Sequence, residues 1–158
     1  MTSVIRSLIK MSNISIHDLM VGDWVSFKDH PVEIYRTNAI GIVSFYGHPS
    51  NIDYSIDDIE PIRITGEILT KNGFKYVERD QNRAGRYVWS SDGKRDGALI
   101  EVTIYNPPAT GGVKYLVGIF TECTHDSGIN RVHNCDIEYV HELQHAIKLC
   151  KIDKEIYL

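Results

Sequence analysis

The first part of the chain alternates short apolar runs with glycine, proline, asparagine and aspartate. Such spacing favours a small antiparallel barrel over β-α-β units. The sequence predicts strands at 21–27, 32–35, 39–46 and 52–54, a helical turn at 55–59 and a closing strand at 60–64. We expect the first strand to bury Trp24 beside Val25 and Phe27. The pattern therefore predicts an SH3-like small β-barrel over residues 16–64, with residues 1–15 as an N-terminal extension.

The middle of the chain predicts a short helix followed by a second set of strands. Thr65 is a good N-cap and Gly73 a good helix end, so residues 65–74 are interpreted as a linker helix. Apolar runs then predict strands at 75–79, 86–90, 98–105 and 113–121. Together with the last helix they predict an antiparallel meander over residues 75–158, so the fold class is β-rich α+β.

The last predicted element is a helix from about Asp136, as N-cap, to Cys150. At 100° per residue one face of this helix is apolar, and the packing face consists of Tyr139, Val140, Leu143, Ala146, Ile147 and Cys150. His141 and His145 fall nearly opposite this face. We therefore expect Leu143 and Ile147 to be buried and the two histidines to be exposed.

The same helix carries the most informative stretch of the chain, His141-Glu142-Leu143-Gln144-His145. In H-E-x-x-H proteins two histidines one turn apart bind zinc and the glutamate is the general base. Lysine at position 151 rules out the longer form with a third histidine six residues on. Our interpretation is therefore an exposed histidine pair, and a zinc hydrolase with Glu142 as catalytic residue is kept as an alternative.

A second set of zinc-type ligands flanks a predicted turn at 126–130. Cys123 and His125 precede the turn, and His133 and Cys135 follow it. Alternation along two paired strands could bring all four onto one face, although structural zinc sites prefer gaps of two to four residues. A polar hairpin end with buried thiols is the preferred interpretation, so no cofactor is expected and zinc is an alternative.

A basic segment with interleaved aromatic residues spans positions 79–95. It resembles single-strand binding surfaces, and its candidate contacts are Arg79, Arg83, Arg86, Trp89, Lys94 and Arg95. Asp80 and Asp92 within this segment, and Glu78 just before it, offset its positive charge, which favours a solvated hairpin face with Trp89 in the core. Nucleic-acid binding is therefore an alternative rather than the main expectation.

Composition and charge bear on the compartment in which the protein works and on whether it enters a membrane. The chain has 158 residues and a formal net charge of −4, with basic surplus only in the middle. No apolar run approaches the ~18 residues of a membrane span, so no membrane role is expected. Three cysteines cannot all pair within one chain, which favours a reducing cytosol.

Three segments, Gly22–Val25, Ile59–Phe74 and Tyr139–Ala146 with Lys154–Ile156, together resemble a family of small uncharacterised proteins. These proteins are encoded by Bacteroides-type gut bacteria and their prophages. The resemblance runs from about Ile16 to the end of the chain. It implies no established activity, and it implies that other residues are tolerated at position 145. With the motifs above, it favours a non-enzymatic cytosolic module for interaction with a protein partner, from a phage or mobile element.

Overall fold

The computed structural model describes residues 14–49, 51–77, 85–91, 98–105, 114–121 and 130–158. Its contacts divide the chain into two units, Met1–Pro61 and Ile62–Leu158. Each unit contains one five-stranded antiparallel sheet. The predicted β-rich α+β class is confirmed.

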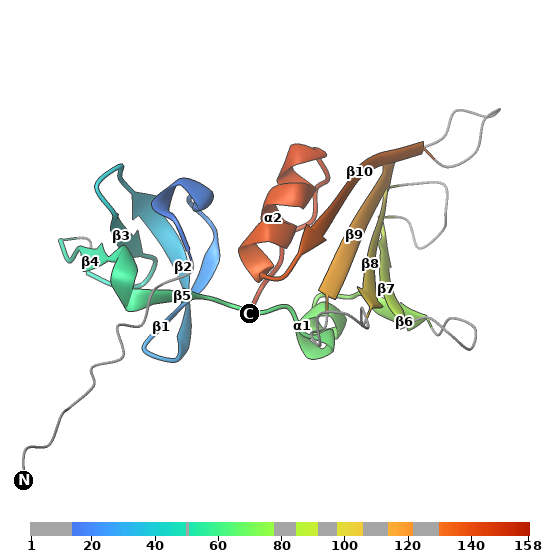
Figure 1. Cartoon of the computed structure of the whole chain (residues 1–158). Helices are drawn as coiled ribbons and strands as arrows, with labels where there is room; N and C mark the ends of the chain where they lie inside the picture. The colour runs from blue at the N-terminus through green and yellow to red at the C-terminus, as the bar shows by residue number, and fades with distance from the viewer. Residues whose placement is uncertain (1–13, 50, 78–84, 92–97, 106–113, 122–129) are drawn as a thin grey trace, which may run out of the picture. The chain divides into compact units, whose positions relative to one another are not determined.

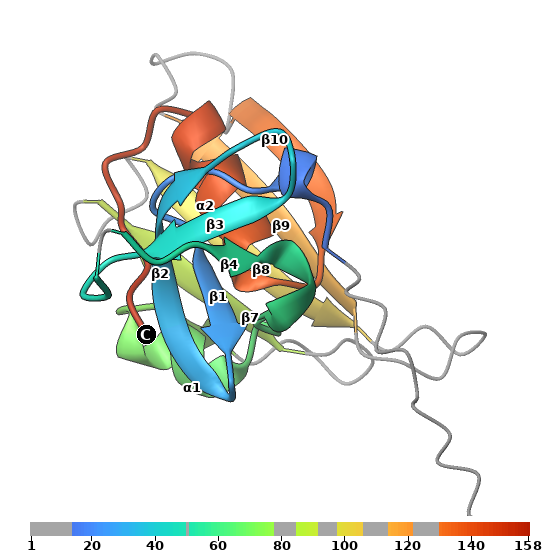
Figure 2. The ribbon, with the colours of Figure 1, turned by 90° about the vertical axis from the view of Figure 1, so that its left-hand side faces the viewer.

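The first unit is a half-barrel, a curled sheet with strand order β4-β3-β2-β1-β5 (Figure 2). Two 3-10 turns accompany the strands. The elements in chain order are η1 (Ile16–Asp18), β1 (Trp24–Phe27), β2 (His30–Thr37), β3 (Ile42–Phe45), β4 (Tyr54–Ser55), η2 (Ile56–Asp58) and β5 (Ile59–Pro61). The predicted turn before the closing strand is therefore present as η2.

Alternation along β1 decides which of its side chains enter the half-barrel core. Val25 and Phe27 are buried, whereas Trp24 is only half-buried. Because successive side chains of a strand point to opposite faces, Trp24 cannot share the face of Val25 and Phe27. The prediction that all three are buried together is wrong for Trp24. The core is completed from the other strands, mainly by Val32, Ile34, Val43, Phe45 and Ile59.

The second unit is a meander sheet with strand order β10-β9-β8-β7-β6 and two helices (Figure 1). In chain order it contains α1 (Gly66–Lys71), β6 (Lys75–Val77), β7 (Arg86–Ser90), β8 (Leu99–Tyr105), β9 (Lys114–Thr121), β10 (Asn130–Ile137) and α2 (Val140–Leu149). The cross-strand pairs Ile100↔Ile119 and Val102↔Val117 are fully buried. The predicted meander with a packed C-terminal helix is confirmed.

Helix α1 begins and ends as its sequence predicts. The Thr65 hydroxyl accepts a hydrogen bond from the Ile68 amide at 3.2 Å. Gly73 has φ +81°, the left-handed conformation that favours glycine after a helix. The contacts place this helix within the second unit rather than between the two units.

Helix α2 packs on the sheet through the expected residues but starts later than expected. Leu143 and Ile147 are buried, which confirms the predicted packing positions. However, β10 continues to Ile137, and Asp136 pairs with Leu116 of β9. Asp136 is therefore a strand residue, and the helix N-cap is Tyr139. Among the described helices, none combines the length and apolarity needed to cross a membrane.

Candidate functional site

Glu142, the candidate general base, is engaged at the start of α2. Its Oε2 atom accepts hydrogen bonds from the backbone amides of Glu138 (2.7 Å) and Tyr139 (2.9 Å). This is half of a capping box, in which a glutamate satisfies amides that lack a helical partner. The Glu142 carboxylate thus helps to fix where the helix begins.

The two motif histidines are not the exposed pair that the sequence predicts. His141 is 4 % exposed and buried, and His145 is half-buried. The His141 ring stacks on Tyr139 at a centroid distance of 5.9 Å, and it meets the His145 ring edge-on at 5.9 Å. The sequence places Tyr139 on the packing face of the helix, but in the structure it is the N-cap and its ring stacks on His141. The predicted exposure of His141 is therefore wrong.

The zinc-type residues are not assembled in the part of the chain that the structure describes. Within these residues, no three histidine, cysteine, aspartate or glutamate side chains form a group that could hold a metal ion. Cys123 and His125 lie outside the described residues, and only the backbone of His133, in β10, is described. The four-ligand hairpin site therefore stays a prediction. Burial raises the pKa of the Cys135 thiol, and the nearby charge of Glu142 adds to this effect.

The basic segment is described only in β7. Arg79, Arg83, Lys94 and Arg95 lie outside the described residues. Arg86 donates to Glu101 of β8 at 2.9 Å, and both side chains are largely buried. Trp89 is half-buried with the Lys154 ammonium 6.0 Å from its ring centroid. Of the two described candidates for nucleic-acid contact, one is ion-paired and the other is covered by a cation of its own chain.

A different set of residues is presented outward on the half-barrel. The pairing of β2 with β3 shifts between Ile34 and Arg36, so Tyr35 is an extra residue in a β-bulge. Ile34 stays in the core, whereas Tyr35 and Arg36 are exposed. Bulges of this kind change the direction of side chains and are common beside functional sites.

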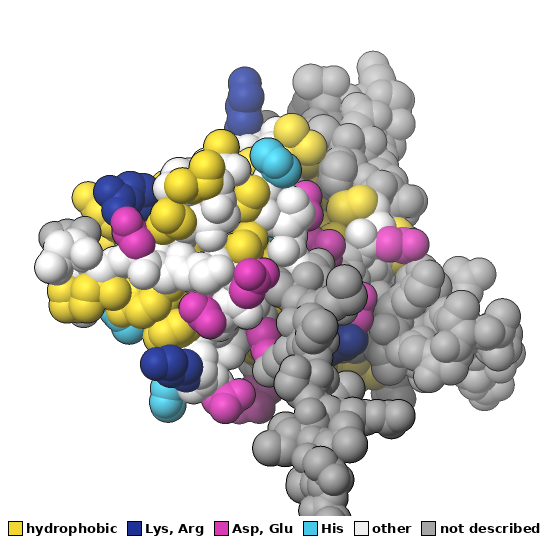
Figure 3. Space-filling view, turned by 60° about the vertical axis from the view of Figure 1, so that its left-hand side comes forward, with side chains coloured by type: hydrophobic (Ala, Val, Ile, Leu, Met, Phe, Trp, Pro, Cys, Tyr) yellow, Lys and Arg dark blue, Asp and Glu magenta, His cyan; other side chains and the backbone are white. Residues whose placement is uncertain are grey.

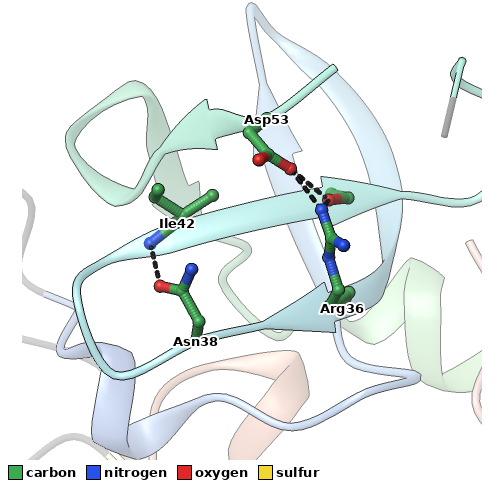
Figure 4. A network of polar contacts seen from close by, with 5 residues as sticks. Arg36, Asn38, Ile42 and Asp53 are labelled. Carbon is green, nitrogen blue, oxygen red and sulfur yellow. Dashed lines mark hydrogen bonds and ion pairs between the residues drawn. The ribbon is translucent and has the colours of Figure 1, made fainter. Parts of the chain in front are cut away.

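Two tyrosines and an ion pair form the resulting surface, which we call the outer surface (Tyr35, Arg36, Tyr46 and Asp53); the buried Ser44 bonds to this ion pair. Tyr35 and Tyr46 are 48 % and 50 % exposed, and their rings meet edge-on at 5.1 Å. Arg36 donates to the Asp53 carboxylate at 2.5 Å, and Ser44 donates to the same oxygen at 3.0 Å (Figure 4). These contacts fix the arginine beside the tyrosine pair.

The turn between β2 and β3 holds this surface in place. The Asn38 side-chain oxygen accepts from the amide of Ile42 at 3.1 Å (Figure 4) and from the amide of Ile40, also at 3.1 Å. Gly41 follows with φ +81°, and its carbonyl accepts from the Ile56 amide at 2.9 Å. The hairpin is therefore bonded at its tip and to η2, so the outer surface lies on a preorganised support.

The half-barrel is also strongly acidic. Residues 14–61 contain eight acidic and only two basic side chains, Lys28 and Arg36. Figure 3, which brings this unit forward, shows hydrophobic side chains gathered on it with acidic side chains between and below them. A surface of this composition favours proteins over nucleic acid as partners, because phosphate groups require basic contacts.

Sequence reasoning did not single out the outer surface. Tyr35 follows the core residue Ile34 and lies within a predicted strand, so alternation alone places it outside. The bulge that also turns Arg36 outward depends on pairing between strands, which no local pattern gives. The signal available in the sequence was a pair of tyrosines, Tyr35 and Tyr46, in two successive predicted strands.

No protein-family model, curated protein or solved structure matches this chain. The resemblance to the gut-bacterial and prophage family therefore stays a prediction.

Proposed function

We propose that the protein is a non-enzymatic protein-interaction module that binds its partner through the outer surface of the half-barrel. The observation that carries this proposal is the exposed Tyr35–Tyr46 pair, which a β-bulge presents on a bonded hairpin. Tyrosine and arginine are enriched in binding hot spots because they combine a large contact area with polar groups. A rigid support lowers the entropy lost on binding.

The setting we propose is the cytosol of a bacterial cell, with the gene on a phage or other mobile element. The odd number of cysteines supports a reducing compartment. The resemblance described above supports the mobile-element origin.

The test is partner capture with matched variants. The full chain, a Tyr35→Ala/Tyr46→Ala variant and a Tyr157→Ala control are immobilised and exposed to an extract of the encoding cells, and bound proteins are quantified by mass spectrometry. Tyr157 is also about half exposed but lies in the second unit. We expect at least one protein to be retained by the full chain and the control and lost from the double variant.

Thermal melting of the three proteins provides the necessary check. The double substitution removes one edge-on ring contact between half-exposed side chains and should cost no more than about 1 kcal/mol, so all three proteins should melt within a few degrees of one another. Identical capture profiles for folded variants would overturn the assignment of the outer surface.

A further inference from the structure

One carboxylate on the outward side of the half-barrel lies in a row of aromatic residues. Glu33 of β2 is the cross-strand partner of Trp24 in β1. On its other side, the Tyr46 amide donates to the Glu33 carbonyl at 3.0 Å. The neighbouring pairs Val25↔Val32 and Ile34↔Phe45 are buried, so alternation places Trp24, Glu33 and Tyr46 on the face opposite the core.

The Glu33 side chain is half-buried, and its charge is not neutralised by its surroundings. Over the residues that the structure describes, no hydrogen bond or ion pair reaches its carboxylate. Directly opposed cross-strand side chains have Cβ atoms about 5 Å apart, so the Trp24 ring lies within reach of a cation held by Glu33. The tyrosine pair supplies further ring faces through Tyr46 and its neighbour Tyr35.

The two cations of the half-barrel are already engaged. Arg36 is paired with Asp53, and the Lys28 ammonium lies 5.0 Å from the centroid of the Phe27 ring. Residues 14–61 contain eight acidic and only two basic side chains. Of the two basic side chains, one is paired with Asp53 and the other lies over the Phe27 ring. Among the described residues of this unit, neither basic side chain is paired with Glu33, and a basic side chain of a partner would complement its carboxylate.

We propose that Glu33, framed by Trp24 and Tyr46, binds a lysine or arginine side chain of the partner protein. The proposal rests on the outer surface being the interaction site and names its electrostatic anchor. A carboxylate gives a charge-assisted hydrogen bond to the cation, and the aromatic faces attract it through their π electrons. The acidic field of the whole half-barrel speeds the approach of a basic segment.

The test uses three short synthetic peptides with the same leucine anchors and either lysine, glutamate or serine between them. Binding to the ¹⁵N-labelled full chain is followed by NMR titration. We expect the lysine peptide to bind best and to shift the amide signals of Glu33 and Tyr46. Glu33→Gln should weaken its binding about tenfold, because the charge is lost while the shape is kept.

Asp58→Asn is the matched control, since it removes the same charge from an exposed position of the same unit. Its effect should be less than about twofold, as expected of a distant charge at moderate salt. If the two variants lost the same amount of affinity for the lysine peptide, the effect would be general electrostatic attraction and the Glu33 site would be overturned. The absence of binding by the lysine peptide would overturn it as well.

Equal binding of all three peptides, lost in the Tyr35→Ala/Tyr46→Ala variant and unchanged in Glu33→Gln, would remove the cation site and leave the outer surface intact. Partner capture that survives the double tyrosine substitution would remove both.

Discussion

The two units of the chain differ in their charge balance and in how the residues of their candidate sites are engaged. In the second unit, which has 13 basic and 13 acidic residues, several described polar side chains, including those of the predicted sites, bond within the unit. Arg86 pairs with Glu101, Arg63 pairs with Glu138, and Glu142 caps α2. In the half-barrel, the outer surface turns two tyrosines toward solvent, and acidic residues strongly outnumber basic ones.

This contrast shows why a sequence motif is weaker evidence for function than the contacts that its residues make in the structure. H-E-x-x-H contains every residue type that zinc chemistry needs, yet its glutamate binds two backbone amides and its first histidine is buried. The outer surface matches no motif, but its side chains are exposed on a fixed support. Four predictions test this division of roles.

The largest expected effect is loss of the helix packing in the second unit. Leu143→Ala or Ile147→Ala removes a fully buried aliphatic side chain and should lower the free energy of unfolding by about 2–5 kcal/mol. Leu149→Ala is the control, because Leu149 is 70 % exposed on the same helix. Urea unfolding measures all three, and equal midpoints would mean that α2 does not pack as described.

The next effect concerns the capping role of Glu142. Glu142→Ala leaves two backbone amides without their acceptor and should cost about 1–2 kcal/mol. Glu142→Gln keeps an acceptor oxygen and should cost clearly less. A chelator should change neither melting curve. Equal destabilisation by both substitutions would argue that the charge of Glu142, rather than its capping bonds, is what matters.

Most of the fold could be predicted because it depends on local patterns. Alternation located the strands up to β9, and Thr65 and Gly73 located the ends of α1, whereas β10 was not among the predicted strands. The start of α2 could not be predicted in this way. Asp136 is a good N-cap by residue type, but its pairing with Leu116 keeps it in β10, so tertiary pairing overrides the local preference.

A smaller effect is expected at the second motif histidine. His145→Ala removes one edge-on ring contact with His141 and should cost about 0.5–1 kcal/mol. Thermal melting of parent and variant with and without a chelator is the measurement. A parent that loses stability with chelator, beside a variant that does not, would make zinc binding the better explanation.

The smallest effect is a pH dependence from two half-buried thiols. Burial raises the pKa of Cys135 and Cys150, so the folded protein favours their neutral form. Their contribution to stability is complete at neutral pH and is lost as the pH rises above the ordinary thiol value of about 8.5. The Cys135→Ser/Cys150→Ser variant should therefore lose less stability than the parent between neutral and alkaline pH. Parallel loss in both proteins would mean that other groups control the alkaline transition.

The candidate site was less predictable than the fold. The sequence favoured residues with distinctive chemistry, such as His141 and Arg86. In the structure, however, the His141 ring stacks on Tyr139, and Arg86 is paired with Glu101. The exposed tyrosines carry no distinctive pattern. Their relevance depends on a register shift between β2 and β3, which is a property of the paired strands.

Partner capture well below the melting temperature, compared between Tyr35→Ala/Tyr46→Ala and Glu142→Ala, tests the division of roles most directly. The account predicts that the tyrosine variant loses its partner and melts like the parent, whereas the Glu142 variant melts earlier and keeps its partner. Loss of the partner from the folded Glu142 variant, with full capture by the tyrosine variant, would contradict the account and move the interaction site to the second unit.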